Sequence, residues 1–297
     1  MTRISTSLVL YKSSLVELQP LFTSLQQSEL ICAWVVVDNA AAEDAESAGR
    51  LRALVESMGG RVIAPGTNVG FGAGHNLALR SLDDVPSDFH LMLNPDILFD
   101  SEVLPALAHA MKDRPQAGLV TPRVLYPDGT DQYLCKLLPT PLDFALRRFA
   151  PGALQRLARS RMERYELRGL VTTESTCVPF MSGCFMFTRR SMLEAVGGFD
   201  DRFFLYLEDV DLCRRLAAFS ELLYWPEVSI THGYHRGAHR NTKLMLLFIL
   251  SAVRYFNKWG WLFDAARRKA NSDALALLSN TRLSTVSAPI AGSKARR

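Results

Sequence analysis

The sequence predicts an α/β fold with a mostly parallel β-sheet that is covered by helices on both faces. Over the first 120 residues, short apolar segments typical of strands alternate with longer segments typical of helices. In addition, 48% of the residues are hydrophobic and 22% are charged, a composition that supplies a large core and excludes a disordered chain, a collagen and a coiled coil. The expected strands lie at residues 7–10, 33–37, 61–64, 89–93 and 118–121, and the expected helices at 15–27, 43–58, 74–82 and 102–112.

The pattern changes after residue 121, where a Tyr-Pro-Asp-Gly turn and a Pro-interrupted stretch precede an Arg-rich segment. Further strands are expected at 183–189, 222–225 and 228–230, and helices at 191–196, 207–219 and 242–261. We therefore expect a main domain at 1–240, with a basic amphipathic insertion at 147–168. An aromatic helix within 241–270 and a flexible basic tail at 271–297 should follow.

The net charge of +4 is unevenly distributed. Residues 147–168 contain seven Arg against two acidic residues, and residues 267–297 contain seven Lys or Arg against one Asp, so the rest of the chain is acidic. A nucleic-acid-binding protein more often spreads positive charge across a domain face, so no nucleic-acid partner is expected.

Cysteine usage and hydropathy bear on the compartment. The five cysteines include no C-x2-C pair, which favours buried reduced thiols in a cytosolic protein over a zinc or redox site. The N-terminus lacks the pattern of a signal peptide, and the longest apolar run, residues 244–253, is about half the length of a membrane span. We expect a soluble or peripheral protein.

Two acidic residues follow predicted strands. Asp38 comes directly after the strand at 33–37, and Asp96 follows the strand at 89–93 after Asn94 and Pro95. In open α/β sheets the ligand crevice lies beyond the carboxyl ends of the strands, so both carboxylates would point into one crevice if the two strands are parallel neighbours. Simple turns are the alternative, because Asp and Asn favour turns in any case.

Residues 68–76 form a glycine-rich loop between a strand and a helix, where backbone can approach a phosphate closely. The glycine spacing is G-x-G-x-G and the loop follows the third strand, so a nicotinamide-dependent dehydrogenase is a poorer interpretation. Asn94 and Asp96 offer oxygen ligands for Mg2+ or Mn2+, with a diphosphate and water completing the shell.

A third acidic group, Glu208-Asp209-Val210-Asp211, stands at a predicted helix start. Carboxylates there suit the helix dipole, so capping is one interpretation and a general base the other. His232, His235 and His239 follow, but nothing nearby forces a zinc site.

Taken together, these motifs resemble those of the inverting glycosyltransferases of family 2, which have the Rossmann-like GT-A fold of nucleotide-diphospho-sugar transferases. The resemblance covers about residues 4–262. It rests on segments 35–39, 68–72, 93–96, 182–186, 198–200 and 204–212, in the expected order. Within the family, residues 232–241 and 251–256 are most similar to rhamnosyltransferases that act on lipid-linked N-acetylglucosamine in O-antigen or cell-wall polysaccharide assembly.

The resemblance implies a role for each matching residue. Asp209 would be the catalytic base, with Glu208 as its partner. Asp96 would bind a divalent cation, Mg2+ or Mn2+, with His232 near the cation or the diphosphate. The donor would be bound by Asp38, which contacts the nucleotide base, and by Asn39, Asn68, Gly70, Asn76 and Asn94. Asn94 stands where many relatives carry an Asp, which implies a weaker metal site.

The resemblance also implies partners and a location. The donor would be dTDP-rhamnose and the acceptor a polyprenyl-diphosphate-linked saccharide, at the cytoplasmic face of the inner membrane. The insertion at 147–168 and the aromatic face of the helix at 242–261 could then lie on the bilayer, with core packing and a solvated Arg face as the alternative. Another nucleotide sugar, or binding without catalysis, remains open.

Overall fold

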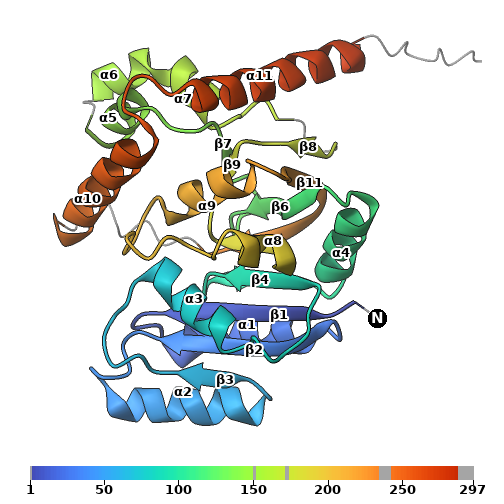
Figure 1. Cartoon of the computed structure of the whole chain (residues 1–297), viewed down its shortest axis with the longest axis vertical. Helices are drawn as coiled ribbons and strands as arrows, with labels where there is room; N and C mark the ends of the chain where they lie inside the picture. Colours follow the sequence, from blue (N-terminus) through green and yellow to red (C-terminus); the bar gives the residue numbers. More distant parts are fainter. Residues whose placement is uncertain (1, 150–151, 171–173, 234–241, 287–297) are drawn as a thin grey trace, which may run out of the picture.

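The computed structural model describes residues 2–149, 152–170, 174–233 and 242–286 (Figure 1). In this part of the chain nine strands form one mixed sheet, and two more form a small second sheet. In spatial order the large sheet contains β3 (Arg61–Ile63), β2 (Ile31–Asp38), β1 (Ile4–Leu10), β4 (Phe89–Leu93), β10 (Phe185–Arg189), β6 (Ala117–Leu125), β11 (Glu221–His232) and β5 (Ile97–Leu98), with β8 (Thr176–Cys177) paired to β11. The small sheet pairs β7 (Cys135–Lys136) with β9 (Phe180–Met181).

The first four strands of the order are parallel, as predicted, and β10 runs antiparallel between β4 and β6. The strands that carry Asp38 and Asp96 are not direct neighbours, because β1 lies between β2 and β4. The two strands expected at 222–225 and 228–230 are one strand, β11, whose register to β6 shifts between Trp225 and Ser229.

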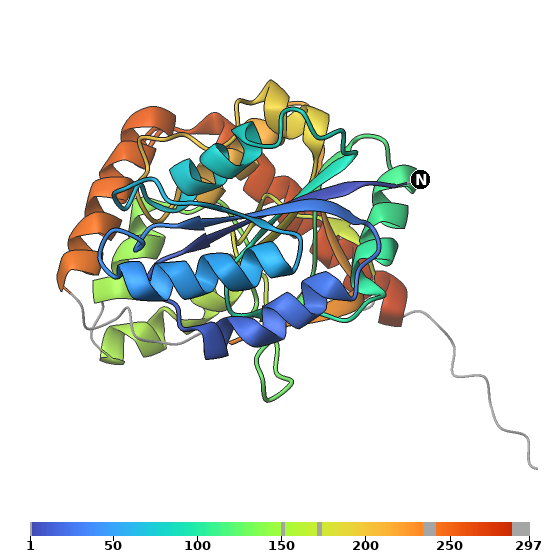
Figure 2. The ribbon, with the colours of Figure 1, turned by 90° about the horizontal axis from the view of Figure 1, so that it is seen from below.

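Helices cover both faces of the sheet (Figures 1 and 2). Side chains of α1 (Leu15–Gln26), α2 (Ala45–Ser57) and α4 (Val103–Asp113) pack on one face, and those of α3 (Phe71–Arg80), α8 (Arg190–Ala195) and α9 (Glu208–Leu216) on the other. The start of α1 is fixed by a capping box: Glu17 N–H donates to the Ser14 hydroxyl at 3.3 Å, and Ser14 N–H donates to the Glu17 carboxylate at 2.9 Å.

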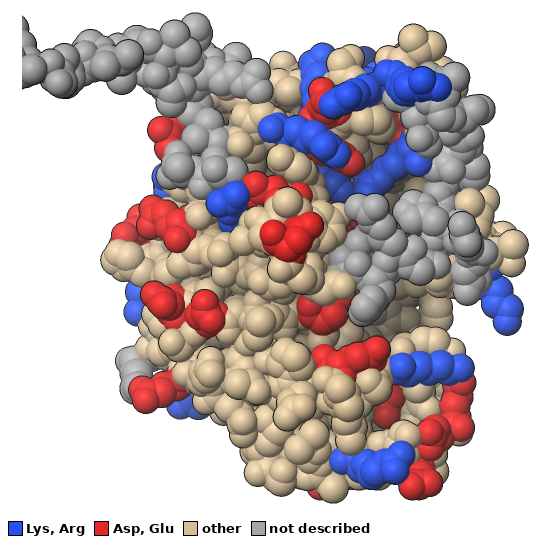
Figure 3. All heavy atoms as spheres, turned by 180° about the vertical axis from the view of Figure 1, so that it is seen from behind, with Lys and Arg blue, Asp and Glu red and all other residues tan. Residues whose placement is uncertain are grey.

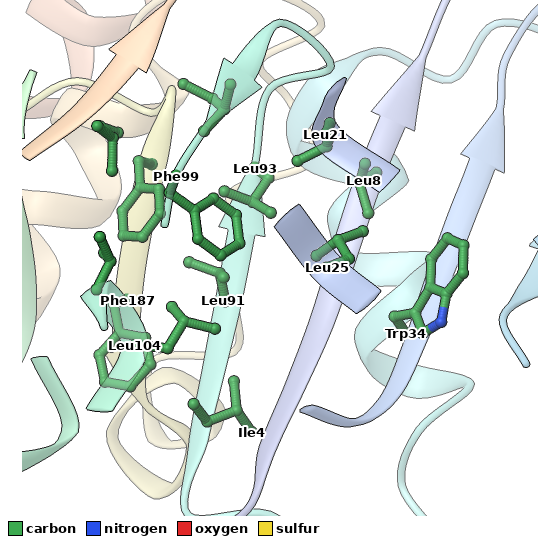
Figure 4. Packing of buried hydrophobic residues seen from close by; sticks show 14 of the residues in the cluster. Ile4, Leu8, Leu21, Leu25, Trp34, Leu91, Leu93, Phe99, Leu104 and Phe187 are labelled. Atoms are coloured by element: carbon green, nitrogen blue, oxygen red, sulfur yellow. The ribbon is translucent and has the colours of Figure 1, made fainter. Parts of the chain in front are cut away.

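Strand β1 shows why helices must cover both faces of the sheet. All seven of its residues are buried, and they alternate between the two faces. Leu8 packs with α1 and α2 in the larger core (Figure 4), whereas Val9 packs with α3. Burying both faces fixes the strand register, because a slip of one residue would exchange the faces.

The C-terminal segment differs from the prediction. Helix α10 (Thr242–Trp259) is followed by α11 (Ala265–Val286), so residues 271–286 of the expected flexible tail are helical, and residues 287–297 lie outside the described part. On α10, Tyr255 and Phe256 are buried in the core, so core packing, the alternative to a membrane face, holds for these two aromatic residues. A buried ion pair between Arg214 of α9 and Asp264, with N–O distances of 2.7 and 3.0 Å, fixes this segment to the main domain.

The basic insertion is also built differently from one amphipathic helix. It consists of three short helices, α5 (Pro141–Phe149), α6 (Gly152–Leu157) and α7 (Arg159–Tyr165), which pack on one another. Leu154 and Leu157 are exposed, while Tyr165 is buried.

All five cysteines are free thiols, but only three of them are buried. Cys177 is half-buried and Cys32 is exposed, so the expectation of buried thiols is wrong for Cys32. No helix in the described ranges is long and apolar enough to cross a membrane.

Candidate active site

A cavity of about 820 Å³ opens where the ends of β4 and β11 meet the start of α9. Its walls also include β7, α5 and the segment 165–168 that follows α7. The structure brings five of the predicted site residues together in this one cavity: Asn94, Asp96, Glu208, Asp209 and His232. The acidic motifs of Asp96 and of Glu208-Asp209 therefore meet in one cavity.

Asp209 is held by two backbone amides. Gly183 N–H donates to one carboxylate oxygen at 3.0 Å, and Val210 N–H donates to the other at 2.8 Å. A Cβ at position 183 would lie 3.2 Å from the Asp209 Cβ, so a side chain there would crowd Asp209. Residues Tyr206 and Leu207 have positive φ angles of 73° and 69°, an unfavourable conformation for non-glycine residues that turns the chain into α9 and aims Asp209 at the cavity.

Burial perturbs both carboxyl groups at this helix start. Burial and then the neighbouring Asp209 raise the pKa of Glu208 well above its usual 4.5. Burial also raises the pKa of Asp209, while the two amide hydrogen bonds and the charge of Lys136 act in the opposite direction. Glu208 Oε2 is buried and has no hydrogen-bond partner among the described residues. Capping alone does not explain a carboxyl group in this position, because a helix cap bonds to backbone amides.

Asp96 and His232 form the second pair in the cavity. His232 Nε2 lies 3.3 Å from Asp96 Oδ1 and 3.4 Å from Asn94 Nδ2. On the other side of the ring, Nδ1 lies 2.9 Å from Gln132 Oε1. The Gln132 amide nitrogen donates to the backbone carbonyls of His232 at 2.7 Å and of Leu125 at 3.1 Å, which fixes its oxygen toward the histidine. Nδ1 therefore carries a proton, and Nε2 faces Asp96.

This donor set fits a divalent cation. Adjacent ligands of octahedral Mg2+ or Mn2+ lie about 3 Å apart, and the Asp96 oxygen and the His232 nitrogen are separated by 3.3 Å. Within the described ranges no three His, Cys, Asp or Glu side chains are grouped to hold a metal ion. The chain thus offers two ligands here, and phosphate oxygens and water would have to supply the others.

The predicted donor-binding residues do not all line this cavity. Asp38 lies instead in a second cavity, of about 670 Å³, between the ends of β1 and β2 and the start of α2. There it is buried and accepts a hydrogen bond from Ala40 N–H at 2.9 Å. Lys12 and Glu43 form an ion pair at 2.8 Å on the same wall.

Asn39, Asn68 and Gly70 shape the glycine-rich loop and line neither cavity. Asn39 binds both Val69 N–H and the Gly70 carbonyl, each at 3.2 Å. Asn68 accepts from Gly70 N–H at 2.9 Å. Gly70 has a φ of 91°, and a Cβ there would lie 2.2 Å from the Phe204 carbonyl oxygen, so only glycine fits.

Asn76 also lines neither cavity. Its amide binds the backbone of Phe199 through both N–H and carbonyl groups, at 2.9 and 2.8 Å, and donates to Asp201 at 2.6 Å. These bonds join α3 to the segment before α9. A role of Asn39, Asn68, Gly70 and Asn76 in donor binding stays a prediction.

Several polar residues of the cavity were missed in the sequence analysis, among them Gln132, Lys136 and Arg147. Arg147 begins the basic insertion, whereas Gln132 and Lys136 belong to no motif that the sequence singles out. Lys136 is recognised as a candidate only by its burial in the structure, since Lys is almost never fully buried without a partner. His235 and His239 lie outside the described residues.

Comparison with known proteins agrees with this geometry. No protein-family model matches the chain. It is 29% identical over 218 residues to the N-acetylglucosaminyl-diphospho-decaprenol L-rhamnosyltransferase of Mycobacterium tuberculosis, an alignment that covers 67% of this chain and 69% of that protein. It is 26% identical over 228 residues to the rhamnosyltransferase WbbL of Escherichia coli K12, covering 73% of this chain and 78% of WbbL.

Among solved structures, the chain is similar to GalNAc-T7 in its crystal structure with UDP, GalNAc and Mn2+. The TM-score is 0.62 at 14% sequence identity, and the match covers 87% of this chain and 48% of GalNAc-T7. The similarity at this identity concerns the fold, which is that of the GT-A glycosyltransferases. The chain is therefore a glycosyltransferase of the GT-A fold, as its resemblance to family 2 predicted.

Proposed function

We propose that this protein transfers L-rhamnose from dTDP-rhamnose to a hydroxyl group of a lipid-linked saccharide, with inversion at the anomeric carbon, in bacterial surface polysaccharide synthesis. The observation that carries the proposal is the meeting of Asp209 with the Asp96–His232 pair in one cavity. The names of the two sequence relatives support the choice of sugar and of a lipid-linked acceptor.

In this mechanism Asp209 accepts the proton of the acceptor hydroxyl while the hydroxyl oxygen attacks the anomeric carbon and the bond to the diphosphate breaks. The amides of Gly183 and Val210 hold the carboxylate in one orientation, which favours an in-line attack. Burial that raises the pKa of Asp209 makes it a better proton acceptor than an exposed Asp. No covalent enzyme intermediate is needed.

Asp96 and His232 would hold a divalent cation at the donor diphosphate. When bound, the cation would neutralise charge on the leaving nucleoside diphosphate. Gln132 keeps Nε2 of His232 directed at that place. GalNAc-T7, solved with UDP and Mn2+, supports a cation in this fold.

The proposal is tested by measuring release of nucleoside diphosphate from a panel of nucleotide sugars. The acceptor is short-chain polyprenyl-diphospho-N-acetylglucosamine, and each reaction is run with Mg2+, with Mn2+ and with EDTA. Release from dTDP-rhamnose that requires both acceptor and metal is the expected result. Release from a different donor would keep the mechanism and refute the rhamnosyl assignment. No release from any donor by the folded protein would favour a binding protein without turnover.

We also propose that the protein associates with the cytoplasmic face of the inner membrane. Exposed apolar residues at helical spacing form one stripe on α10: Leu246, Ile249, Leu250 and Val253. On the face seen in Figure 3, Lys and Arg side chains gather at the top, the end of the molecule that carries α5–α7 in Figure 1. Flotation with anionic vesicles at low and high salt tests this idea; no binding at low salt would refute it.

A further inference from the structure

Two cationic side chains of the active-site cavity, Lys136 and Arg147, form no hydrogen bond or ion pair with a carboxylate of the described residues. Lys136 is only 7% exposed, and Arg147 of α5 reaches the same cavity from the more exposed side. Neither side chain makes a hydrogen bond or an ion pair with any described residue. The third cationic side chain of this wall, Arg168, is instead paired with Glu166 at 2.8 Å and lies over the Tyr133 ring.

Burial of most of a Lys side chain disfavours its charged form, and a neighbouring guanidinium disfavours it further. Burial and the charge of Arg147 lower the pKa of Lys136 to about 8. Two other buried cations of the described residues are bonded by the protein itself: Arg214 is held by Asp264, and Arg267 donates to three backbone carbonyls. An anion bound in the cavity would offset the repulsion between Lys136 and Arg147.

The position of the pair indicates which anion. Lys136 is close enough to Asp209 for its charge to oppose the rise in the pKa of that carboxyl. Asp209 faces the acceptor hydroxyl in the proposed mechanism, whereas the donor diphosphate would lie at Asp96 and His232. In a polyprenyl-diphosphate-linked sugar, the diphosphate is one sugar ring away from the hydroxyl groups. An anion beside Asp209 therefore suits the acceptor.

Apolar side chains continue the same wall. Phe144 packs edge-on against Phe248 with ring centroids 5.2 Å apart, and Phe248 contacts Tyr206 at 5.8 Å. All three line the cavity together with Lys136 and Arg147. A cationic pair beside an aromatic wall matches a ligand that carries a diphosphate and an apolar chain.

We propose that Lys136 and Arg147 form an acceptor subsite, in which they bind the diphosphate of the lipid-linked acceptor beside Asp209. The inference rests on the proposed function for the identity of the anion. It assigns the acceptor an orientation, with its diphosphate toward β7 and α5 and its reacting hydroxyl toward α9.

The test is direct binding of farnesyl diphosphate, which has the diphosphate and the apolar chain but no sugar. Calorimetry is done on the full chain with dTDP and Mg2+ at saturation, so that the donor site is occupied. Lys136→Gln and Arg147→Gln should each weaken binding at least tenfold, and affinity for dTDP should stay unchanged. Arg52→Gln, on the exposed face of α2, is the matched control and should bind like wild type.

Three results would overturn the subsite: equal binding by both variants and wild type, displacement of farnesyl diphosphate by dTDP, or no binding of farnesyl diphosphate by the wild type. Thermal melting checks folding, and Lys136→Gln should melt no lower than wild type because it removes a partly desolvated charge that Arg147 repels. Because binding is measured without turnover, a failed transferase assay with intact binding would refute the proposed reaction and leave the subsite standing.

Discussion

The variant Asp209→Asn tests the catalytic base most directly. The amide keeps the shape of the carboxylate but cannot accept the proton, and loss of a general base costs about 10²–10⁴ in rate. The side chain now has one acceptor oxygen for two amides, Gly183 and Val210, so one N–H loses its partner at about 1–3 kcal/mol of stability. A chain of 297 residues with three apolar clusters should stay folded under that loss.

The assay is steady-state kinetics with donor and acceptor varied in turn. We expect kcat to fall about 10²–10⁴-fold while KM for the donor stays nearly unchanged, because the interaction is made only in the transition state. The base works when ionised, so wild-type kcat should fall as the pH drops through the raised pKa of Asp209, above the ordinary 3.8. Asp209→Asn should lack that acidic limb.

The matched control is Asp113→Asn, an exposed carboxylate on α4 whose side chain is 61% accessible. It should have wild-type kinetics. If Asp209→Asn retains more than about a tenth of wild-type kcat, the assignment of Asp209 as the base is wrong. A fall in donor affinity equal to the fall in kcat/KM would instead move Asp209 to the donor site.

Three further changes test the network around this site. Glu208→Gln should raise Tm at pH 8. Because the pKa of Glu208 is raised in the folded state, its stabilising contribution is present below pH 4.5 and is lost as the pH rises through the folded-state pKa. Thermal unfolding of the variant, measured over a range of pH, should lack this dependence of Tm on pH. Arg214→Ala should cost about 3–5 kcal/mol in urea unfolding, since it leaves the buried Asp264 carboxylate with only one cationic partner among the described residues, the Arg267 guanidinium, whose Nε is 3.9 Å away. Lys269→Ala, which breaks an exposed pair, should cost about 0–1 kcal/mol. Gln132→Leu should weaken Mn2+ affinity about 10–100-fold by releasing the His232 ring; unchanged affinity in a titration would refute the role of Gln132.

The sequence was sufficient for the elements whose burial pattern is periodic. The parallel order around β1 follows from apolar strands that alternate with helices, and the strand bounds differ from the predicted ones by a few residues. Local signals were also sufficient for the acidic motifs, because carboxylates after strand ends and at a helix start are visible in the chain. The sequence alone could not show that Asp96, Asp209 and His232 share one cavity, because these residues are far apart in the chain and only the fold brings them together.

Other features follow from tertiary contacts and have no local signal. Residues 271–286 are poor in large apolar side chains and were expected to be unstructured, yet Asn271 binds the Leu138 backbone through both its amide groups, at 2.8 and 2.9 Å, and Ala274 is buried. Similarly, the aromatic residues of α10 could face a membrane or the core, and only the partner surface decides between them. Phe256 is buried because its ring packs against the rings of Phe144 and Trp261.

Lys136 shows the same limit at the site itself. In sequence it is one Lys in a Pro-interrupted stretch, and its charge favours solvent. Its burial is imposed by the pairing of β7 with β9, in which Lys136 is opposite Phe180. A two-residue strand has no periodicity to read, so neither the pairing nor the desolvated charge could be predicted. Only the structure shows that Lys136 is buried close to Asp209. The farnesyl diphosphate experiment therefore tests a binding role that comes from the fold and not from a sequence motif.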